Sequence, residues 1–264
     1  MNFPRILKKR KGYIDRIKPF MQKSVAKVLT GQRRVGKSFL LYQLIEEILA
    51  EEPDANIIYV NLEDFTFSSL QTAEDLHSYI ISHSKEKVKN YIFIDEIQDI
   101  PGFEKVIRSL LLNEDNDIYI TGSNAKMLSG ELATYLSGRY IEFKIYSLSY
   151  SEFLEFHGLT ESETSYELYS RYGGLPYLLN LPLEDETVNE YLKSVYSTIV
   201  FRDVVSRYKL RNTLFLEKLI QFLSENIGNL FSAKNISDYL KSQHTAISVN
   251  QIPVSYTHLR AHET

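Results

Sequence analysis

The sequence predicts an α/β protein whose core is a doubly wound parallel sheet. A glycine-rich loop, GQRRVGKS at 31–38, follows the short β-prone run KVLT and precedes a helical segment with an apolar face. The runs NIIYVNLED at 56–64 and YIFIDEIQDI at 91–100 are apolar enough for strands buried on both faces, and helical segments separate them. Strands that alternate with helices are typical of parallel sheets, which bind ligands at the carboxyl ends of their strands.

The loop has the G-x-x-x-x-G-K-[S/T] spacing that cradles phosphate groups. Gly31 and Gly36 permit positive φ angles, so backbone N–H groups can turn toward phosphate oxygens. Lys37 supplies a positive charge for the β and γ phosphates, Ser38 offers a hydroxyl to Mg²⁺, and the following helix adds the positive end of its dipole. The alternative is a glycine turn with a chance lysine. The nucleotide-binding residues that we predict here are Gly31, Gln32, Arg33, Arg34, Val35, Gly36, Lys37, Ser38 and Phe39.

Two acidic residues follow the apolar run at 91–94. Asp95 would lie at the carboxyl end of a buried strand beside the loop, where it can hold Mg²⁺ through the water shell of the ion. Glu96 can orient or deprotonate the attacking water. Such a pattern alone usually marks a strand that ends in solvent, but its spacing after Lys37 favours the catalytic interpretation.

Further candidates for the site are single residues. Ser123 or Asn124, after the third buried strand, can donate to the γ-phosphate or the attacking water, although a plain Gly-Ser-Asn turn is equally consistent. Arg139 lies between a helix and a strand at the rim of the sheet, where it can reach a neighbouring subunit's nucleotide or pair with a surface carboxylate. Ile14 precedes the first strand and would contact the adenine or pack on the surface.

Composition excludes several classes of protein and site. The 264 residues contain no cysteine, which excludes disulfides and thiolate metal sites. No apolar run approaches the length of a membrane span, and Met1 to Lys11 lacks the apolar centre of a signal peptide, so we expect a cytoplasmic protein with no membrane partner. The net charge of −4 gives no global attraction to nucleic acid. The basic run from Lys8 to Lys11 is a local patch or, as we favour, a solvated terminus.

The strand pattern ends at about residue 147. The segments after it have helical periodicity and are interrupted sharply at Gly173-Gly174-Leu175-Pro176, which predicts a small helical lid over 148–208. Three shorter helical segments follow, the first two with Asn212 and Ser232 as N-caps. They have the layout of a helix-turn-helix that reads DNA, but three short helices also form ordinary packing modules. If this module is incomplete, apolar residues are left short of partners, among them Leu219, Phe222 and Ile236.

The motifs GQRRVGKS, FIDEIQ, ITGSN, LSGRY, YGGLP and FRDVV occur in this order and resemble those of a prokaryotic AAA-type ATPase family. In that family an ATPase core and a helical lid precede a winged helix and a nuclease-like C-terminal domain of unknown function. The resemblance covers about residues 10–252. It implies ATP as the nucleotide, places Pro176 in a lid segment that faces the nucleotide, supports Ser123 and Asn124 as a sensor turn, and makes Arg139 a better arginine finger than Arg202.

The resemblance divides the chain into an ATPase core at 1–147, the lid at 148–208, a partial winged helix at 209–252 and a tail at 253–264. The tail, PVSYTHLRAHET, resembles a translated sequencing adaptor, and we expect a truncated gene product. The expected function is Mg²⁺-dependent hydrolysis of ATP to ADP and phosphate, coupled to lid and winged-helix movement, with a homo-oligomer and DNA as potential partners. The alternative is a nucleotide-gated DNA-binding regulator with little turnover.

Overall fold

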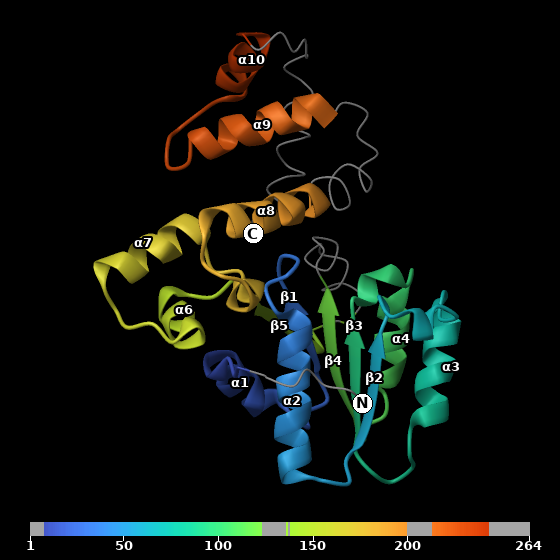
Figure 1. The fold of residues 1–264 in the computed structure, drawn as a ribbon. Helices are drawn as coiled ribbons and strands as arrows, with labels where there is room; N and C mark the ends of the chain where they lie inside the picture. Colours follow the sequence, from blue (N-terminus) through green and yellow to red (C-terminus); the bar gives the residue numbers. More distant parts are fainter. Residues whose placement is uncertain (1–7, 123–135, 137, 200–212, 243–264) are drawn as a thin grey trace. The chain divides into compact units, whose positions relative to one another are not determined.

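A computed structural model of the protein describes residues 8–122, 136, 138–199 and 213–242. The chain divides into two compact units, residues 1–188 and residues 189–264. The first unit contains a parallel sheet with helices against both of its faces (Figure 1). The predicted α/β class with a doubly wound parallel sheet is therefore confirmed.

The sheet has five parallel strands in the order β2-β3-β4-β1-β5. Its strands are β1 (Ala26–Thr30), β2 (Asn56–Asn61), β3 (Asn90–Asp95), β4 (Asn116–Gly122) and β5 (Tyr140–Lys144). Every residue of β1, β3 and β4 is buried, as expected for strands in the middle of a parallel sheet, and this includes the polar residues Lys27 and Asp117. The expectation that the run at 56–64 is buried on both faces is wrong, because β2 is an edge strand in which only Ile58 and Val60 are buried. The register pairs Asn61 with Asp95 and Thr30 with Gly122, so the carboxyl ends of these strands meet along one edge.

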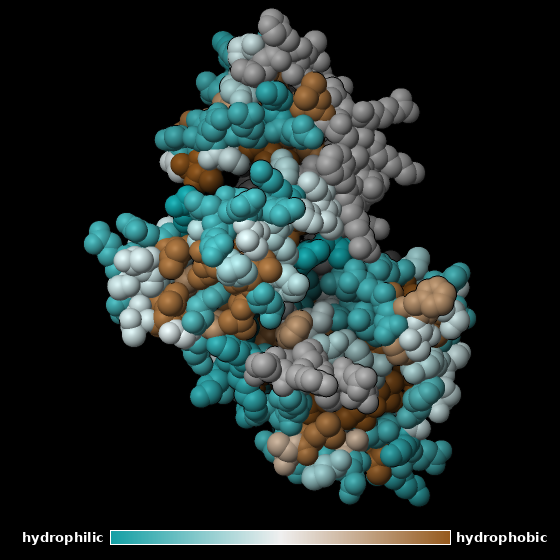
Figure 2. All heavy atoms as spheres, viewed as in Figure 1, coloured by the Kyte–Doolittle hydropathy of each residue, from teal (hydrophilic) through white to brown (hydrophobic). Residues whose placement is uncertain are grey.

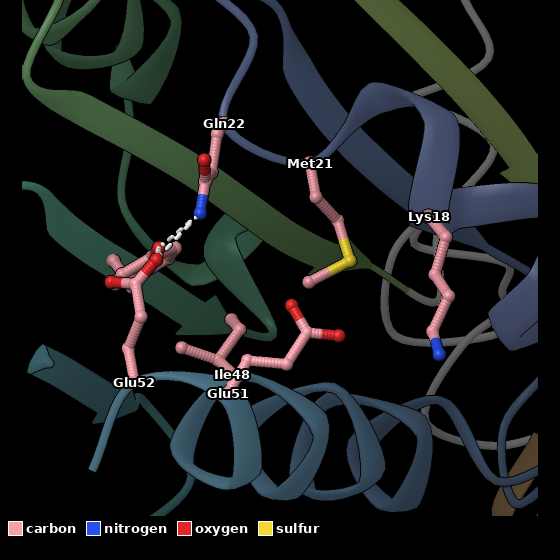
Figure 3. A pocket seen from close by; sticks show the side chains of 7 residues that line it. Lys18, Met21, Gln22, Ile48, Glu51 and Glu52 are labelled. Carbon is pink, nitrogen blue, oxygen red and sulfur yellow. Dashed lines mark hydrogen bonds between the residues drawn. The ribbon is translucent and has the colours of Figure 1, made fainter.

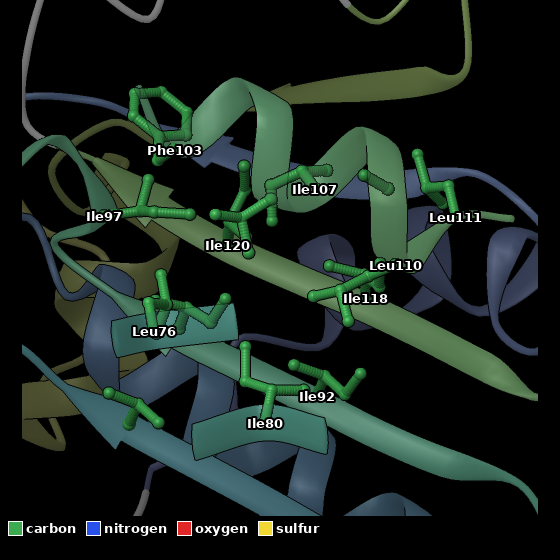
Figure 4. Close-up of a cluster of buried hydrophobic side chains, with 14 of the residues drawn as sticks. Leu76, Ile80, Ile92, Ile97, Phe103, Ile107, Leu110, Leu111, Ile118 and Ile120 are labelled. Carbon is green, nitrogen blue, oxygen red and sulfur yellow. The ribbon is translucent and has the colours of Figure 1, made fainter. Parts of the chain in front are cut away.

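Alternate residues of the strands face two separate apolar clusters, because side chains in a strand alternate between the faces of the sheet. One face packs against α3 (Ala73–His83) and α4 (Phe103–Leu110), and Figure 4 shows the α4 side chains over those of β4. The other face packs against α1 (Lys11–Ile17) and α2 (Lys37–Glu51). Full burial of an aliphatic side chain of this kind contributes about 1.5–3 kcal/mol, so the two clusters fix the strands in place.

Short 3₁₀ turns connect several of these elements. They are η1 (Lys18–Phe20), η2 (Phe65–Phe67) and η3 (Ile97–Asp99). The last of them begins directly after Glu96 and turns the chain away from the carboxyl end of β3.

Helices follow the sheet in the chain. They are α6 (Tyr150–His157), α7 (Glu163–Tyr172), the 3₁₀ turn η5 (Pro176–Asn180) and α8 (Asp185–Thr198). A small cluster of Leu148, Phe153 and Phe156 is buried beneath α6 and α7, and Figure 2 shows apolar side chains among polar ones on the surface of these helices. The described part of 148–199 contains no strand, which agrees with its helical periodicity. Its action as a lid stays a prediction.

The second unit contains α9 (Thr213–Glu225) and α10 (Ala233–Ser242). Ser232 is the N-cap of α10 as expected, because its Oγ accepts a hydrogen bond of 3.2 Å from the N–H of Asn235. The expectation that apolar residues here lack partners is wrong, because one shared cluster buries Leu219, Phe222 and Ile236. Asn212 and the third helical segment lie outside the described residues, and the winged helix stays a prediction.

No helix among the described residues has the length and apolar character needed to cross a membrane.

Candidate functional site

The loop between β1 and α2 has the backbone geometry of a phosphate cradle. Gly31 has a φ of 148° and Gly36 a φ of 95°, both in the region that favours glycine. A methyl group at Gly31 would also collide with the carbonyl oxygen of Ile145. Helix α2 begins at Lys37, so the positive end of its dipole lies at the loop. Together these features are the ones that a phosphate-binding loop requires, and they lie at the carboxyl edge of the sheet.

Lys37 lies inside the loop and is only 4% exposed. Its Nζ donates to the carbonyl oxygens of Gly31 and Gln32 at 3.0 and 3.1 Å and lies 3.7 Å from Oε1 of Glu96. Burial lowers the pKa of Lys37, while the negative charges of Glu96 and Asp95 oppose that change. This ammonium can exchange its carbonyl partners for phosphate oxygens, which form stronger charge-assisted hydrogen bonds.

Asp95 is the last residue of β3 and is almost fully buried. Its carboxylate accepts hydrogen bonds from the hydroxyls of Ser38 and Thr121 and, at 3.3 Å, from Tyr59. The pKa of Asp95 lies above its ordinary value, because burial raises it more than the hydrogen bonds from Ser38 and Thr121 lower it.

The Ser38 hydroxyl and the Asp95 carboxylate are hard oxygen donors, as Mg²⁺ requires. No group of three or more histidine, aspartate or glutamate side chains forms a metal cage within the described parts of the chain. Mg²⁺ usually binds to one or two carboxylates together with waters and substrate phosphates, so one carboxylate and one hydroxyl are a sufficient set of protein ligands. The residues present therefore fit the ion.

Glu96 follows Asp95 in a left-handed backbone conformation, with a φ of 56°. This conformation costs a residue with a side chain about 1 kcal/mol. The N–H of Glu96 donates to Oγ1 of Thr121 at 3.0 Å, and Nε2 of Gln98 donates to the Glu96 carboxylate at 2.5 Å. The backbone turn directs the Glu96 side chain back toward Lys37.

Thr121 is a residue of the site that the sequence interpretation missed. It lies in β4 and holds both acidic residues, through its bond to the Asp95 carboxylate and its bond from the Glu96 N–H. The register that pairs Ile94 with Ile120 brings it to this position. Alignment of the two apolar runs as parallel neighbours would have identified Thr121, because it is the first hydroxyl residue beyond the apolar part of its strand.

Pro176 and Ile14 are two further residues that we predicted to contact the nucleotide. A methyl group built on Gly36 would be 3.6 Å from Cγ of Pro176, so Pro176 lies against the loop. Ile14 is buried in the apolar cluster beneath α2, so the alternative that it packs on the surface is wrong. Contact of either residue with a nucleotide stays a prediction.

The other predicted loop residues differ in exposure. Val35 is buried, Arg33 pairs with Glu63 at 3.0 Å, and the ring of Phe39 is about half exposed. The remaining loop residues of the prediction, Gln32 and Arg34, are exposed.

Arg139 is exposed at the start of β5, and its backbone carbonyl accepts a hydrogen bond of 3.0 Å from the N–H of Ala26. Ser123, Asn124 and Arg202 lie outside the described residues.

We expected the basic run from Lys8 to Lys11 to be a solvated terminus, and for Arg10 this expectation is wrong. Arg10 is 4% exposed and forms an ion pair with Glu152. Lys9 forms an ion pair with Glu47 at the surface of α2, which is consistent with the expected solvated side chain.

A cavity of about 260 Å³ lies near the other end of the sheet, between the end of α2 and the start of β3 (Figure 3). Glu52 lines it and accepts hydrogen bonds from the Tyr91 hydroxyl at 2.9 Å and from Gln22 at 2.7 Å. The cavity is therefore separate from the loop and the two acidic residues.

A family model described as an AAA domain matches residues 23–154, half of the chain, and one described as a domain of unknown function matches residues 163–252. An uncharacterized protein of Haemophilus influenzae is 37% identical over 255 residues, covering 92% of this chain and 62% of the relative. An uncharacterized protein of Methanocaldococcus jannaschii is 32% identical over 235 residues, covering 84% of this chain and 51% of the relative. The chain thus spans 62% and 51% of the lengths of these two relatives.

Among solved structures, the Orc1 protein of Aeropyrum pernix in complex with DNA has a TM-score of 0.47 at 14% identity, over 97% of this chain and 84% of that chain.

Proposed function

Because the chain belongs to the AAA domain family, we propose that it is an Mg²⁺-dependent ATPase that converts ATP and water to ADP and phosphate. One observation carries this proposal. The lysine of the phosphate cradle and the acidic pair at the end of β3 meet at one edge of the sheet, where Nζ of Lys37 lies 3.7 Å from the carboxylate of Glu96. Phosphoryl transfer needs this combination of an anion site, a metal site and a base.

In this proposal each group has a distinct task in binding. The backbone of the loop and the start of α2 hold the phosphates, and Lys37 donates to the β and γ phosphates. Ser38 and Asp95 hold Mg²⁺, which neutralises phosphate charge when it is bound.

Glu96 then orients or deprotonates the attacking water. Thr121 supports this role, because its hydroxyl holds the N–H of Glu96 and the carboxylate of Asp95 at once. The two carboxylates are thereby kept in a fixed relation to each other.

Finer parts of the mechanism are proposals as well. Ser123 or Asn124 senses the γ-phosphate, and Arg139 completes the site of a neighbouring copy in a homo-oligomer. The position of Pro176 against Gly36 supports a lid that responds to the nucleotide. Contact of Ile14 with the adenine is a proposal of the same kind.

Two substitutions test the assigned roles. We expect Lys37→Ala to lose ATP binding, because it removes the only loop side chain that we assign to the β and γ phosphates. We expect Glu96→Gln to keep ATP binding and to lose hydrolysis, because the amide preserves shape but cannot accept a proton. Binding is measured by calorimetry and hydrolysis by phosphate release. Equal loss of binding in both variants would contradict the roles.

A second candidate is a nucleotide-gated DNA-binding switch in which hydrolysis is slow. The helices α9 and α10, which share their own apolar cluster, favour it because a helix-turn-helix is built from such a pair. This function predicts duplex DNA binding that weakens steeply with salt and changes with ATP. DNA binding that salt leaves unchanged, or no binding at all, would argue against it.

A further inference from the structure

Arg10 is a buried arginine whose guanidinium joins distant parts of the first unit. Nε and Nη2 donate to the two carboxylate oxygens of Glu152 at 2.8 and 2.9 Å. Nη1 donates to the carbonyl oxygens of Val35 and Tyr146 at 3.1 and 2.9 Å, and Nη2 also donates to that of Ser147 at 3.4 Å. All of the N–H donors of the guanidinium are therefore used. A side chain with so complete a set of partners has one defined position.

The bond to Val35 bears directly on the phosphate cradle. Val35 lies within the loop, immediately before Gly36, and the peptide between them is trans. In a trans peptide the C=O and the N–H point in opposite directions. Because Arg10 holds the Val35 carbonyl, the Gly36 N–H points away from Arg10. In the proposed function this N–H is one of the loop donors that face the phosphates.

The bond to Glu152 connects this peptide to the first helix after the sheet. Glu152 completes the capping box of α6, because its carboxylate also accepts a hydrogen bond of 2.9 Å from the N–H of Ser149. The carbonyls of Tyr146 and Ser147 belong to the segment between β5 and α6. Arg10 therefore contacts the loop and the start of α6 with one rigid group.

Contacts of Gly174 and Pro176 also connect the segment before α6 with the loop. Leu148 donates its N–H to the carbonyl of Gly174 at 2.7 Å, and a methyl group at Gly174 would collide with the carbonyl of Leu148. Two residues further on, Pro176 lies against Gly36 of the loop. The loop, the segment before α6 and the segment before η5 thus form a closed ring of contacts that includes Arg10.

We propose that Arg10 is a positioning residue for the phosphate cradle, which orients the Val35–Gly36 peptide toward bound phosphates and ties that orientation to the start of α6 through Glu152. This inference rests on the proposed function, because it names a further residue that prepares the same site. It also assigns a task to Arg10, one residue of a basic run that we expected to be solvated.

Lysine cannot replace arginine in this role. An ammonium has three donors around a single charge, whereas the planar guanidinium binds the carboxylate with two parallel bonds and still has donors for the carbonyls. Arg10→Lys keeps the charge and loses this arrangement. A hydrogen bond that involves a charged group contributes enough for its loss to weaken binding roughly tenfold or more.

The test compares ligands that separate the phosphate part from the base. Binding of Mg·ATP, of tripolyphosphate and of adenosine to the full chain is measured by calorimetry for the wild type and for Arg10→Lys. The matched control is Arg16→Lys. Arg10 and Arg16 both lie over the ring of Tyr13, but Arg16 is an exposed residue of α1. We expect Arg10→Lys to weaken ATP and tripolyphosphate by the same factor, roughly tenfold or more, and to leave adenosine unchanged. The control should behave as the wild type.

The outcomes separate the two proposals. If the wild type binds neither ATP nor tripolyphosphate, the proposed function fails. If the wild type binds both and Arg10→Lys binds tripolyphosphate equally well, or weakens all three ligands alike, only the inference about Arg10 is overturned. Should Arg10→Lys not fold, Glu152→Gln decides, since it removes the ion pair and keeps the arginine. A loss of tripolyphosphate affinity in that variant supports the proposal, and an unchanged affinity overturns it.

Discussion

Thr121→Val tests whether one hydroxyl holds the acidic pair in place. In the wild type the Thr121 hydroxyl donates to the Asp95 carboxylate and accepts a hydrogen bond of 3.0 Å from the Glu96 N–H. Valine has nearly the shape of threonine but can form neither bond. A hydrogen bond to a charged group contributes about 1.5–3 kcal/mol, and an unsatisfied buried N–H costs about 1–3 kcal/mol. Because the substitution removes the hydrogen bond and leaves the N–H unsatisfied, we expect Thr121→Val to lose about 2.5–6 kcal/mol of unfolding free energy.

The assay is urea unfolding of Thr121→Val beside Thr121→Ser. Serine keeps the hydroxyl and loses a methyl group, so it should remain within about 1 kcal/mol of the wild type. Phosphate release should fall in the valine variant more than in the serine variant, because the carboxylate of Glu96 loses its fixed backbone. If valine and serine variants unfold with free energies within about 0.5 kcal/mol of each other, the hydroxyl does not bridge the two acidic residues.

Other parts of the structure give further expectations. Lys27→Met should destabilise the fold by about 3–5 kcal/mol in urea unfolding, because it leaves the fully buried carboxylate of Asp117 without its cation, and an unchanged unfolding midpoint would contradict this. Gly31→Ala should lose ATP binding in calorimetry, because its methyl group collides with the Ile145 carbonyl, and wild-type affinity would refute the close approach. ATP affinity should fall as the pH rises through the pKa of Lys37, since only the ammonium binds phosphate. Burial lowers that pKa, so the fall should begin below the range of an exposed lysine, and an affinity that is constant up to that range would be inconsistent.

Much of the sheet could be predicted from the sequence because its central strands are buried on both faces. β3 and β4 have apolar centres, Tyr91–Ile94 and Ile118–Ile120, and the residues after them reach the carboxyl edge whatever the details of packing. The loop could be predicted equally well, since its spacing alone identifies Gly31, Gly36 and Lys37. These features are local in the chain.

The residues that were missed depend on contacts between remote segments. The role of Thr121 follows from the register of two strands. That of Arg10 follows from a carbonyl 25 residues away and from two carbonyls and a carboxylate more than a hundred residues away in the chain. A basic run next to the N-terminus looks solvated unless its acceptors are known. Ile14 was ambiguous for the same reason, because only the position of α1 against α2 decides its burial.

Phosphate release from Mg·ATP by the full chain, with Glu96→Gln measured beside it, tests the central claim most directly. The proposed ATPase predicts turnover by the wild type and a rate about 10²–10⁴-fold lower in the variant, with ATP binding retained in both. Equal turnover in the two proteins would contradict the role of Glu96. ATP binding without turnover in the wild type would contradict the proposed ATPase activity and favour the nucleotide-gated switch.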